Sequence, residues 1–232
     1  MLITNRWIND LIGLLFPEVC YSCGVGLFRG EKMVCTKCLY DLPFTDYHKY
    51  KENRVAKQLW GRLPVNAAMA MLYFRKGGKV QTLIHRLKYH NKTEIGVFLG
   101  NMLGEKLKEA PLYGDIDIII PVPLHRKKLK LRGYNQSAFI ASGIAEQLGV
   151  GFRDDVLVRV TSTESQTKKS RFSRYENMLL VFKVEIEAEI LNRHVLIVDD
   201  VITTGATLEA CASVLLAKGA AKVSIAALAF AE

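Results

Sequence analysis

A short apolar run at 195–198, VLIV, restricts the fold of this chain more than any other feature. Two aspartates follow it directly, and TTGAT follows at 203–207. A short, wholly apolar run bounded by polar residues is typical of a strand buried on both faces of a parallel sheet. Ligands of such sheets gather at the carboxyl ends of the strands, which is where Asp199 and Asp200 are expected.

Strand-like and helix-like segments alternate along the chain after about residue 64. Further strands are predicted at 66–74, 116–122 and 222–230, and helices at about 80–87, 94–109, 135–148 and 206–218. Gly149 and Gly219 are the expected helix terminators. Two more alternating segments, at 155–160 and 179–184, are expected to pair as strands. This order predicts an α/β fold with a mainly parallel sheet flanked by helices.

The first sixty or so residues have a different composition, dense in cysteine, glycine and turn signals. We therefore expect two domains, at 1–63 and 64–232. The opening residues predict an amphipathic helix that ends at Pro17, with one face formed by Trp7, Leu11, Leu14 and Leu15. The chain has neither a signal-peptide cleavage pattern nor the roughly 18 uninterrupted apolar residues of a membrane span. These features predict a cytoplasmic protein, in a compartment that keeps cysteines reduced.

Positive charge is concentrated in two segments. The 232 residues include 32 Lys and Arg against 23 Asp and Glu, a net charge of +9. Segments 121–135 and 165–175 hold nine cations and no acid, namely Arg126, Lys127, Lys128, Lys130, Arg132, Lys168, Lys169, Arg171 and Arg174. We expect two loops that face polyanions, either the phosphates of a small ligand or a nucleic-acid backbone. The alternative is solvated basic loops that keep the protein soluble.

The acidic pair and the loop behind it suit a sugar phosphate. Two adjacent carboxylates can bind vicinal hydroxyls or a hydrated Mg²⁺ ion. Gly205 permits a tight turn, and the free N–H groups at the start of the next helix can hold a phosphate dianion. The alternative is that the same aspartates and threonines only cap the strand and the helix.

Four cysteines form two CxxC pairs, Cys20 with Cys23 and Cys35 with Cys38. Four thiolates in this pattern suit a structural, tetrahedral Zn²⁺, which a segment this short would need in order to fold. Iron and a pair of redox disulfides are the alternatives. The fifth cysteine, Cys211, is expected to be a buried apolar residue.

The segment VLIVDDVITTGAT at 195–207 resembles the signature of type I phosphoribosyltransferases that binds phosphoribosyl diphosphate (PRPP). The segment IIIPVPLHRKKLKLRGYNQS at 118–137, followed by Gln166, Arg171 and Asn177, is similar to the ComF family of competence proteins. The resemblance covers about the whole chain. It implies a Rossmann-like phosphoribosyltransferase fold with a small N-terminal domain of zinc-ribbon type.

The resemblance also implies roles for individual residues. Asp199 and Asp200 would bind the ribose hydroxyls and Mg²⁺. The 5′-phosphate would be held by Thr203, Thr204, Gly205, Ala206 and Thr207. The diphosphate leaving group would be neutralised by Arg126, Lys127 and Arg132. Arg171 would come from a mobile loop that closes over PRPP, as the similar stretch of amidophosphoribosyltransferases does.

One segment departs from the family pattern. Relatives usually place a glycine shortly after the motif LKY, which stands here at 87–89 and is followed by His90 and Asn91. Asparagine tolerates left-handed backbone, so we expect the turn to survive. The part of Lys88 in binding substrate stays open.

Several functions fit these features. The chain could be an enzyme that transfers a phosphoribosyl group from PRPP to a nitrogenous acceptor, including a nucleotide-salvage enzyme unrelated to competence. It could instead be a DNA-uptake component that binds single-stranded DNA or a partner helicase, with or without catalysis, and it could form a homo-oligomer. The acceptor pocket separates these hypotheses, and the region before residue 116 is the only candidate for a hood that would read a base.

Overall fold

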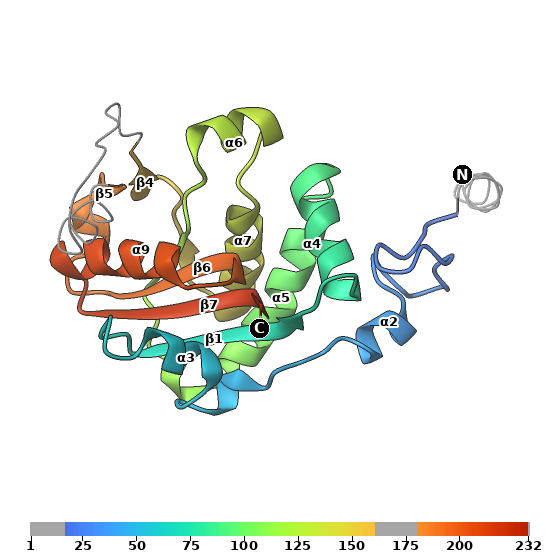
Figure 1. Cartoon of the computed structure of the whole chain (residues 1–232), viewed down its shortest axis with the longest axis horizontal. Coiled ribbons are helices and arrows are strands. Elements are labelled where there is room, and N and C mark those ends of the chain that lie inside the picture. The colour runs from blue at the N-terminus through green and yellow to red at the C-terminus, as the bar shows by residue number, and fades with distance from the viewer. Residues whose placement is uncertain (1–16, 161–180, 232) are drawn as a thin grey trace, which may run out of the picture.

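The computed structural model describes residues 17–160 and 181–231, and its centre is a five-stranded parallel sheet (Figure 1). The strands run in the order β1-β7-β6-β2-β3. Their bounds are Ala67–Phe74, Lys222–Ala231, His194–Ile202, Ile118–Pro121 and Gly151–Phe152. The predicted α/β fold is confirmed, because strands 67–74, 118–121, 194–202 and 222–231 all pair in parallel.

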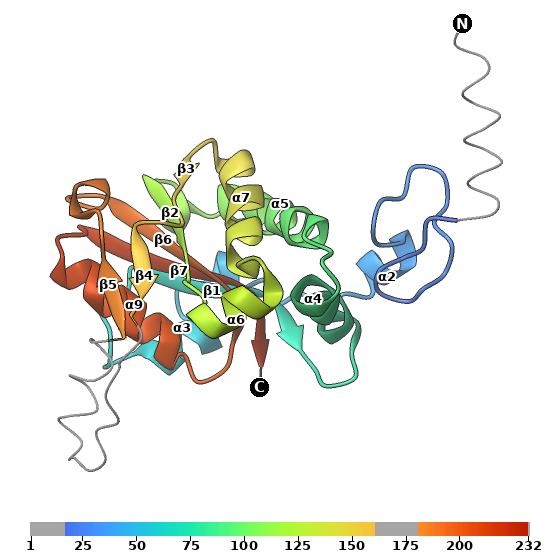
Figure 2. The same cartoon turned by 90° about the horizontal axis from the view of Figure 1, so that it is seen from above.

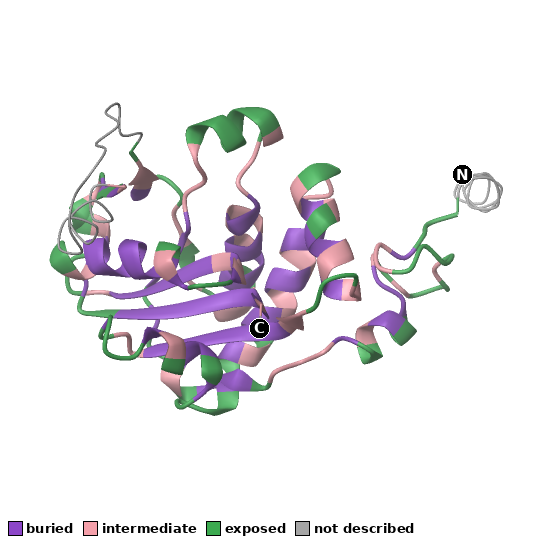
Figure 3. Ribbon diagram, viewed as in Figure 1, coloured by how far each residue is buried: buried purple, intermediate pink, exposed green. Residues whose placement is uncertain are grey.

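Helices cover the sheet and carry the segments between its strands. The longer ones are α4 (Lys79–Tyr89), α5 (Glu94–Lys108), α7 (Gln136–Leu148) and α9 (Ala206–Ala217). Short helices α2 (Thr36–Tyr40), α3 (Arg54–Leu59) and α6 (Arg126–Arg132) complete the set in the described residues. The predicted terminators Gly149 and Gly219 have φ angles of 69° and 98°. Figure 3 shows the sheet buried almost throughout, whereas α6 projects into solvent. No helix of the described segments is long and apolar enough to cross a membrane.

Helices α5 and α7 lie side by side because glycines line their contact (Figure 2). A Cβ atom at Gly100 would overlap the carbonyl of Ile140, and one at Gly143 would overlap the backbone of α5. A Cβ atom at Gly104 would lie 2.7 Å from the Cβ of Gln147. This close approach fixes the first turn of α7, which carries Ser137, against the sheet.

Residues 43–63 pack on the outer strand β1, before the predicted domain boundary. Phe44 bridges Leu72, and the amide of Tyr73 donates to the carbonyl of Pro43. Helix α3 contacts β1 as well, with its N-terminus capped by Asn53. The boundary at 63/64 stays a prediction, but this segment is part of the same hydrophobic core as the sheet.

The cysteine-bearing segment contacts α4 and α5 through Tyr21. The Tyr21 hydroxyl donates to Glu94 Oε1 at 3.0 Å, and the Arg86 guanidinium lies 5.6 Å from the centre of its ring. Lys79 pairs with Asp41 at 2.6 Å, at the end of α2. Figure 1 shows this segment beside α4, on the flank of the sheet.

Two local predictions were wrong. Residues 126–132 form helix α6 instead of a basic loop, with His125 at the N-cap and Gly133, at φ 82°, at the C-cap. Arg, Lys and Leu, which make up RKKLKLR, are good helix formers, but the loop was predicted from the charge of the segment alone. Strand β6 also continues four residues past Val198, so the acidic pair lies within the strand. Pairing of Val201 and Ile202 with β7 maintains the extended backbone. The paired strands predicted around the second basic segment are present as β4 (Leu157–Arg159) and β5 (Phe182–Val184).

Candidate functional site

Asp199 and Asp200 stand near the carboxyl end of β6 and have different partners. Asp200 is 4% exposed, and its Oδ2 lies 2.6 Å from Nζ of Lys88, at the end of α4. Asp199 Oδ1 accepts hydrogen bonds from the Ser137 hydroxyl at 3.1 Å and from the amide of Asp200 at 2.8 Å. The sequence predicted the pair and named Lys88 as a candidate site residue, and the structure adds Ser137 and the contact between Lys88 and Asp200.

The two carboxylates are close enough to affect each other's charge. Burial, followed by the negative charge of Asp200, raises the pKa of Asp199 to about 7. The amide of Asp200, the Lys88 ammonium and the Ser137 hydroxyl act in the opposite direction. Repulsion between the carboxylates and their partial removal from water make the doubly charged state unfavourable. A bound cation or hydroxyl donors would stabilise that state.

Lys88 reaches the acidic pair because the end of α4 is held in place. The Tyr134 hydroxyl donates to the carbonyl of Leu87, the residue before Lys88. Asn91 adopts a φ angle of 52°, which is the left-handed backbone that asparagine tolerates. The turn expected after LKY therefore forms, and it leaves Lys88 pointing at Asp200.

The loop that follows β6 turns sharply into α9. Gly205 has a φ angle of 76°, and a Cβ atom there would lie 3.0 Å from Cδ2 of Leu59. Thr203, Thr204 and Thr207 are exposed, whereas Gly205 is buried. A residue with a side chain would be strained in this conformation and would press against α3.

Residues from α3 and the turn after it brace this loop from behind. Gln58 Nε2 donates to the carbonyl of Thr203 at 2.6 Å. Arg62 pairs with Glu209 Oε2 at 3.0 Å and also donates to the carbonyl of Thr204 at 3.4 Å. Sequence reasoning missed these residues because they lie about 145 positions away and carry no motif. The buried Glu209, three residues after the TTGA segment, was the only local signal.

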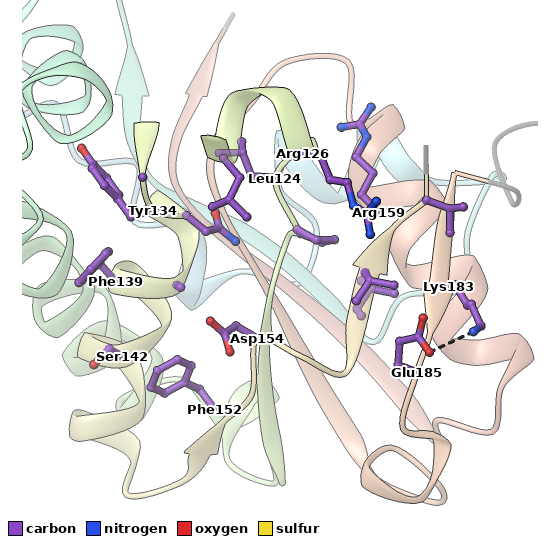
Figure 4. Close-up of a pocket in the computed structure, with 18 residues that line it drawn as sticks. Leu124, Arg126, Tyr134, Phe139, Ser142, Phe152, Asp154, Arg159, Lys183 and Glu185 are labelled. Carbon is purple, nitrogen blue, oxygen red and sulfur yellow. Dashed lines mark hydrogen bonds and ion pairs between the residues drawn. The ribbon is translucent and has the colours of Figure 1, made fainter. Parts of the chain in front are cut away.

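The cations of α6 lie near this site but are divided between two cavities. Arg126 lines a cavity of about 910 Å³ between α6, α7 and the β4–β5 hairpin. Figure 4 shows Leu124 and Arg126 at one end of this cavity, with Phe139 on one side of it and Arg159 on the other. Arg132 and Lys88 line a second cavity of about 430 Å³. Lys127 is exposed and lines neither of them. The joint role predicted for the three cations stays a prediction.

The remaining predicted residues of this site lie in the second basic segment. Gln166, Arg171 and Asn177 fall in 161–180, outside the described residues, as do Lys168, Lys169 and Arg174. The strands at either end of that segment are described. The amide of Val160 donates to the carbonyl of Val181, so the two described residues that flank the segment lie together. Val160 also lines the larger cavity.

The four cysteines of the CxxC pairs converge. Their sulfur atoms all lie within 4.8 Å of one another, and those of Cys23 and Cys35 are 3.8 Å apart. Four thiolates around Zn²⁺, with Zn–S bonds of about 2.3 Å, would be separated by about 3.8 Å. Burial raises the pKa of Cys20, but backbone N–H groups, that of Cys35 first, lower it to about 6 overall. All five cysteines are free thiols, and Cys211 is buried, as predicted. Cys20, Cys23, Cys35 and Cys38 thus fit a tetrahedral metal.

The chain is similar in sequence to several known proteins. The phosphoribosyl transferase domain family model matches residues 135–232, which include the acidic pair and the loop. DNA utilization protein YhgH of Escherichia coli is 29% identical over 230 residues, covering 91% of this chain and 96% of that protein. Competence protein F of Haemophilus influenzae is 31% identical over 147 residues, covering 62% of this chain and 64% of that one.

Among solved structures, one similar chain is the glutamine PRPP amidotransferase of B. subtilis in complex with ADP and GMP. It is 18% identical, with a TM-score of 0.45, and the match covers 62% of this chain. The match spans 30% of the amidotransferase chain.

The raised pKa of Asp199 predicts a stability gain when its charge is removed. Asparagine can keep both hydrogen bonds that Asp199 Oδ1 accepts. Since the folded-state pKa lies above the unfolded value of about 4, wild-type protein loses stability as pH rises from about 4 to 7. Asp199→Asn should raise the free energy of unfolding by about 1 to 3 kcal/mol at pH 8 and by little at pH 4. Urea titrations of the ligand-free protein at both pH values measure this difference.

Asp155→Asn is the matched control. A hydrogen bond from Arg153 lowers the pKa of Asp155, so that substitution should give no gain at pH 8. Equal effects of Asp199→Asn at pH 4 and pH 8 would contradict the assigned electrostatics.

Proposed function

We propose that this chain, which belongs to the ComF family of competence-associated proteins with a phosphoribosyltransferase domain, binds PRPP together with Mg²⁺ at the carboxyl end of β6. The observation that carries the proposal is the acidic pair, whose Asp200 is buried, followed two residues later by the braced loop of Gly205. The rest of the fold holds these two elements in a fixed relation.

Asp199 and Asp200 are the proposed ligands of the ribose hydroxyls and of Mg²⁺. Hydroxyl groups donate hydrogen bonds to carboxylates, and Mg²⁺ would supply positive charge beside the half-buried Asp199 and the buried Asp200. Lys88 supplies part of that charge in the ligand-free protein through its contact with Asp200. Ser137 donates to Asp199 and so orients that carboxylate.

Residues Thr203 to Thr207 are the proposed cradle for the 5′-phosphate. The turn at Gly205 leads into α9, whose dipole favours an anion at this end, and the amide of Ala206 donates to Thr204 Oγ1 at 3.5 Å in the ligand-free protein. Gln58 and Arg62 hold the carbonyls of Thr203 and Thr204 away from the phosphate. The cradle is thus rigid before the ligand arrives, which lowers the entropic cost of binding.

We propose that Arg126, Lys127, Arg132 and Arg171 act on the diphosphate. Charge develops on this group as it leaves the sugar, and guanidinium and ammonium groups would stabilise it. Transfer of the phosphoribosyl group to a nitrogenous acceptor is the enzymatic form of the proposal. PRPP binding without transfer is the regulatory form.

The relatives support a link to DNA uptake. One is named for DNA utilization and another for competence, and we extend that context to this chain as a proposal. The cations of α6 are then candidates for contacts with a DNA backbone as well as with diphosphate. We also place the protein in the cytoplasm, where thiols stay reduced and can bind a metal.

We also propose that Cys20, Cys23, Cys35 and Cys38 hold a structural Zn²⁺. The spacing of the thiols supports this, and backbone N–H groups of Ser22 and Cys35 point at the Cys20 sulfur. Four protein ligands fill the coordination of Zn²⁺, so the ion would fold this segment and leave the chemistry to the sheet.

Loss of the acidic pair tests PRPP binding. Replacing both Asp199 and Asp200 by asparagine should abolish Mg²⁺-dependent binding of PRPP in isothermal titration calorimetry, because the hydroxyl and metal ligands are removed. The wild type should bind PRPP only with Mg²⁺ present. Asp154→Asn, an exposed acid of the larger cavity, is the control and should bind as the wild type does. Unchanged binding by the double variant would refute the proposed site.

Metal analysis tests the cysteine site. Freshly purified protein should contain about one equivalent of zinc by mass spectrometry, and Cys23→Ser should lose most of it. Cys211→Ala should retain it, because Cys211 lies in α9, away from the other four. Less than half an equivalent in the wild type, or full retention by Cys23→Ser, would count against a zinc site.

A further inference from the structure

A row of planar side chains runs along the end of α4 to α6. The rings of His85 and His90 have centroids 5.4 Å apart, and those of His85 and Tyr89 are 4.7 Å apart. The Arg132 guanidinium then lies 5.3 Å from the centre of the Tyr89 ring. Tyr89 is 63% exposed, so much of this residue stays open to solvent although His85 and Arg132 lie against its ring.

The Tyr89 ring lines the cavity of about 430 Å³ between α4 and α6. Figure 1 shows the end of α4 facing α6. Other lining residues are Lys88, Asn91, Lys128, Leu131, Arg132 and Tyr134. Three of these are cations and none is an acid, and Leu131 is 88% exposed. An aromatic ring and a leucine left open to water among cations differ from an ordinary solvated surface, where charges of both signs alternate.

The cavity therefore combines a stacking surface with positive charge. A heterocyclic base stacks on tyrosine and on the guanidinium plane of arginine, and its phosphate pairs with lysine or arginine. A volume of this size is also within the range of small-ligand pockets. We propose that this cavity binds a nucleotide unit, with the base on Tyr89 and the phosphate against Lys128 and Arg132.

The larger cavity fits this ligand less well. Asp154 and Glu185 line it together with Arg126, Arg159 and Lys183, so its charge is mixed (Figure 4). The two acids offset two of the three cations, so the lining attracts a phosphate less strongly. The smaller cavity, whose lining carries charge of one sign only, is the better match for an anion.

Lys88 connects the nucleotide cavity to the acidic pair. It lines the cavity, and its Nζ lies 2.6 Å from Asp200 Oδ2. A base on Tyr89 would thus lie next to the ribose site, which gives the chain the base-binding hood that a transferase requires. This last link rests on the proposed function, whereas nucleotide binding on Tyr89 does not.

Two probes test the cavity in the absence of PRPP and Mg²⁺. Fluorescence anisotropy with a labelled (dT)12 oligonucleotide reports a nucleotide unit within a strand, and calorimetry with AMP reports a free one. Tyr89→Ala should weaken binding about tenfold or more, as expected for loss of one base stack, and Tyr89→Phe should bind as the wild type does. Lys128→Gln should lower the salt dependence of oligonucleotide binding by about 0.7 in the log–log slope.

Tyr50→Ala is the matched control, since Tyr50 is 60% exposed and lies outside the cavity. Tyr89-dependent binding of both probes supports a site open to a DNA strand, and binding of AMP alone supports a site for free nucleotides. Absence of binding by both probes, or equal affinity of wild type and Tyr89→Ala for both, would overturn the proposal. One pattern of results would refute the proposed function alone. In that pattern wild type does not bind PRPP, the oligonucleotide binds wild type and the Asp199→Asn, Asp200→Asn double variant equally, and Tyr89→Ala weakens oligonucleotide binding.

Discussion

The contact between Lys88 and Asp200 links the chemistry of the site to the rest of the structure. Two neighbouring carboxylates in a buried strand repel each other, and burial makes their charged forms costly. Lys88 supplies one positive charge from α4, and Ser137 supplies a hydrogen bond from α7. Each of the two helices that flank the acidic pair thus contributes a group that stabilises it. Mg²⁺ would have to compete with Lys88 for Asp200, so the free energy needed to break the Lys88–Asp200 contact would lower the affinity for Mg²⁺.

Segments far apart in the sequence hold the acidic pair and the loop after it in place. Glycines between α5 and α7 let the helices approach closely enough to hold Ser137 against β6. On the opposite side, Gln58 and Arg62 bind the carbonyls of the loop at 203–204. The cysteine module reaches the same region indirectly, because Tyr21 contacts α4 through Arg86.

Sequence alone predicted what depends on local pattern. The apolar run VLIV identified β6, and Gly149 and Gly219 marked helix ends, since short-range periodicity and backbone preference decide those features. The acidic pair and the loop were found because they are contiguous. Contacts such as Lys88 with Asp200, or Arg62 with Glu209, join residues over 100 positions apart, and one sequence without an alignment contains no record of them. Helix α6 was missed because its charge was more conspicuous than its helix propensity.

A crystal structure of the protein with PRPP and Mg²⁺ tests the central proposal most directly. We expect the 5′-phosphate to accept hydrogen bonds from the backbone between Thr204 and Thr207, and the ribose hydroxyls to contact Asp199 and Asp200. The Lys88 ammonium should then lie farther from Asp200 than the 2.6 Å of the ligand-free protein. An intact Lys88–Asp200 pair with no ligand at the loop, at a saturating concentration of PRPP, would contradict it.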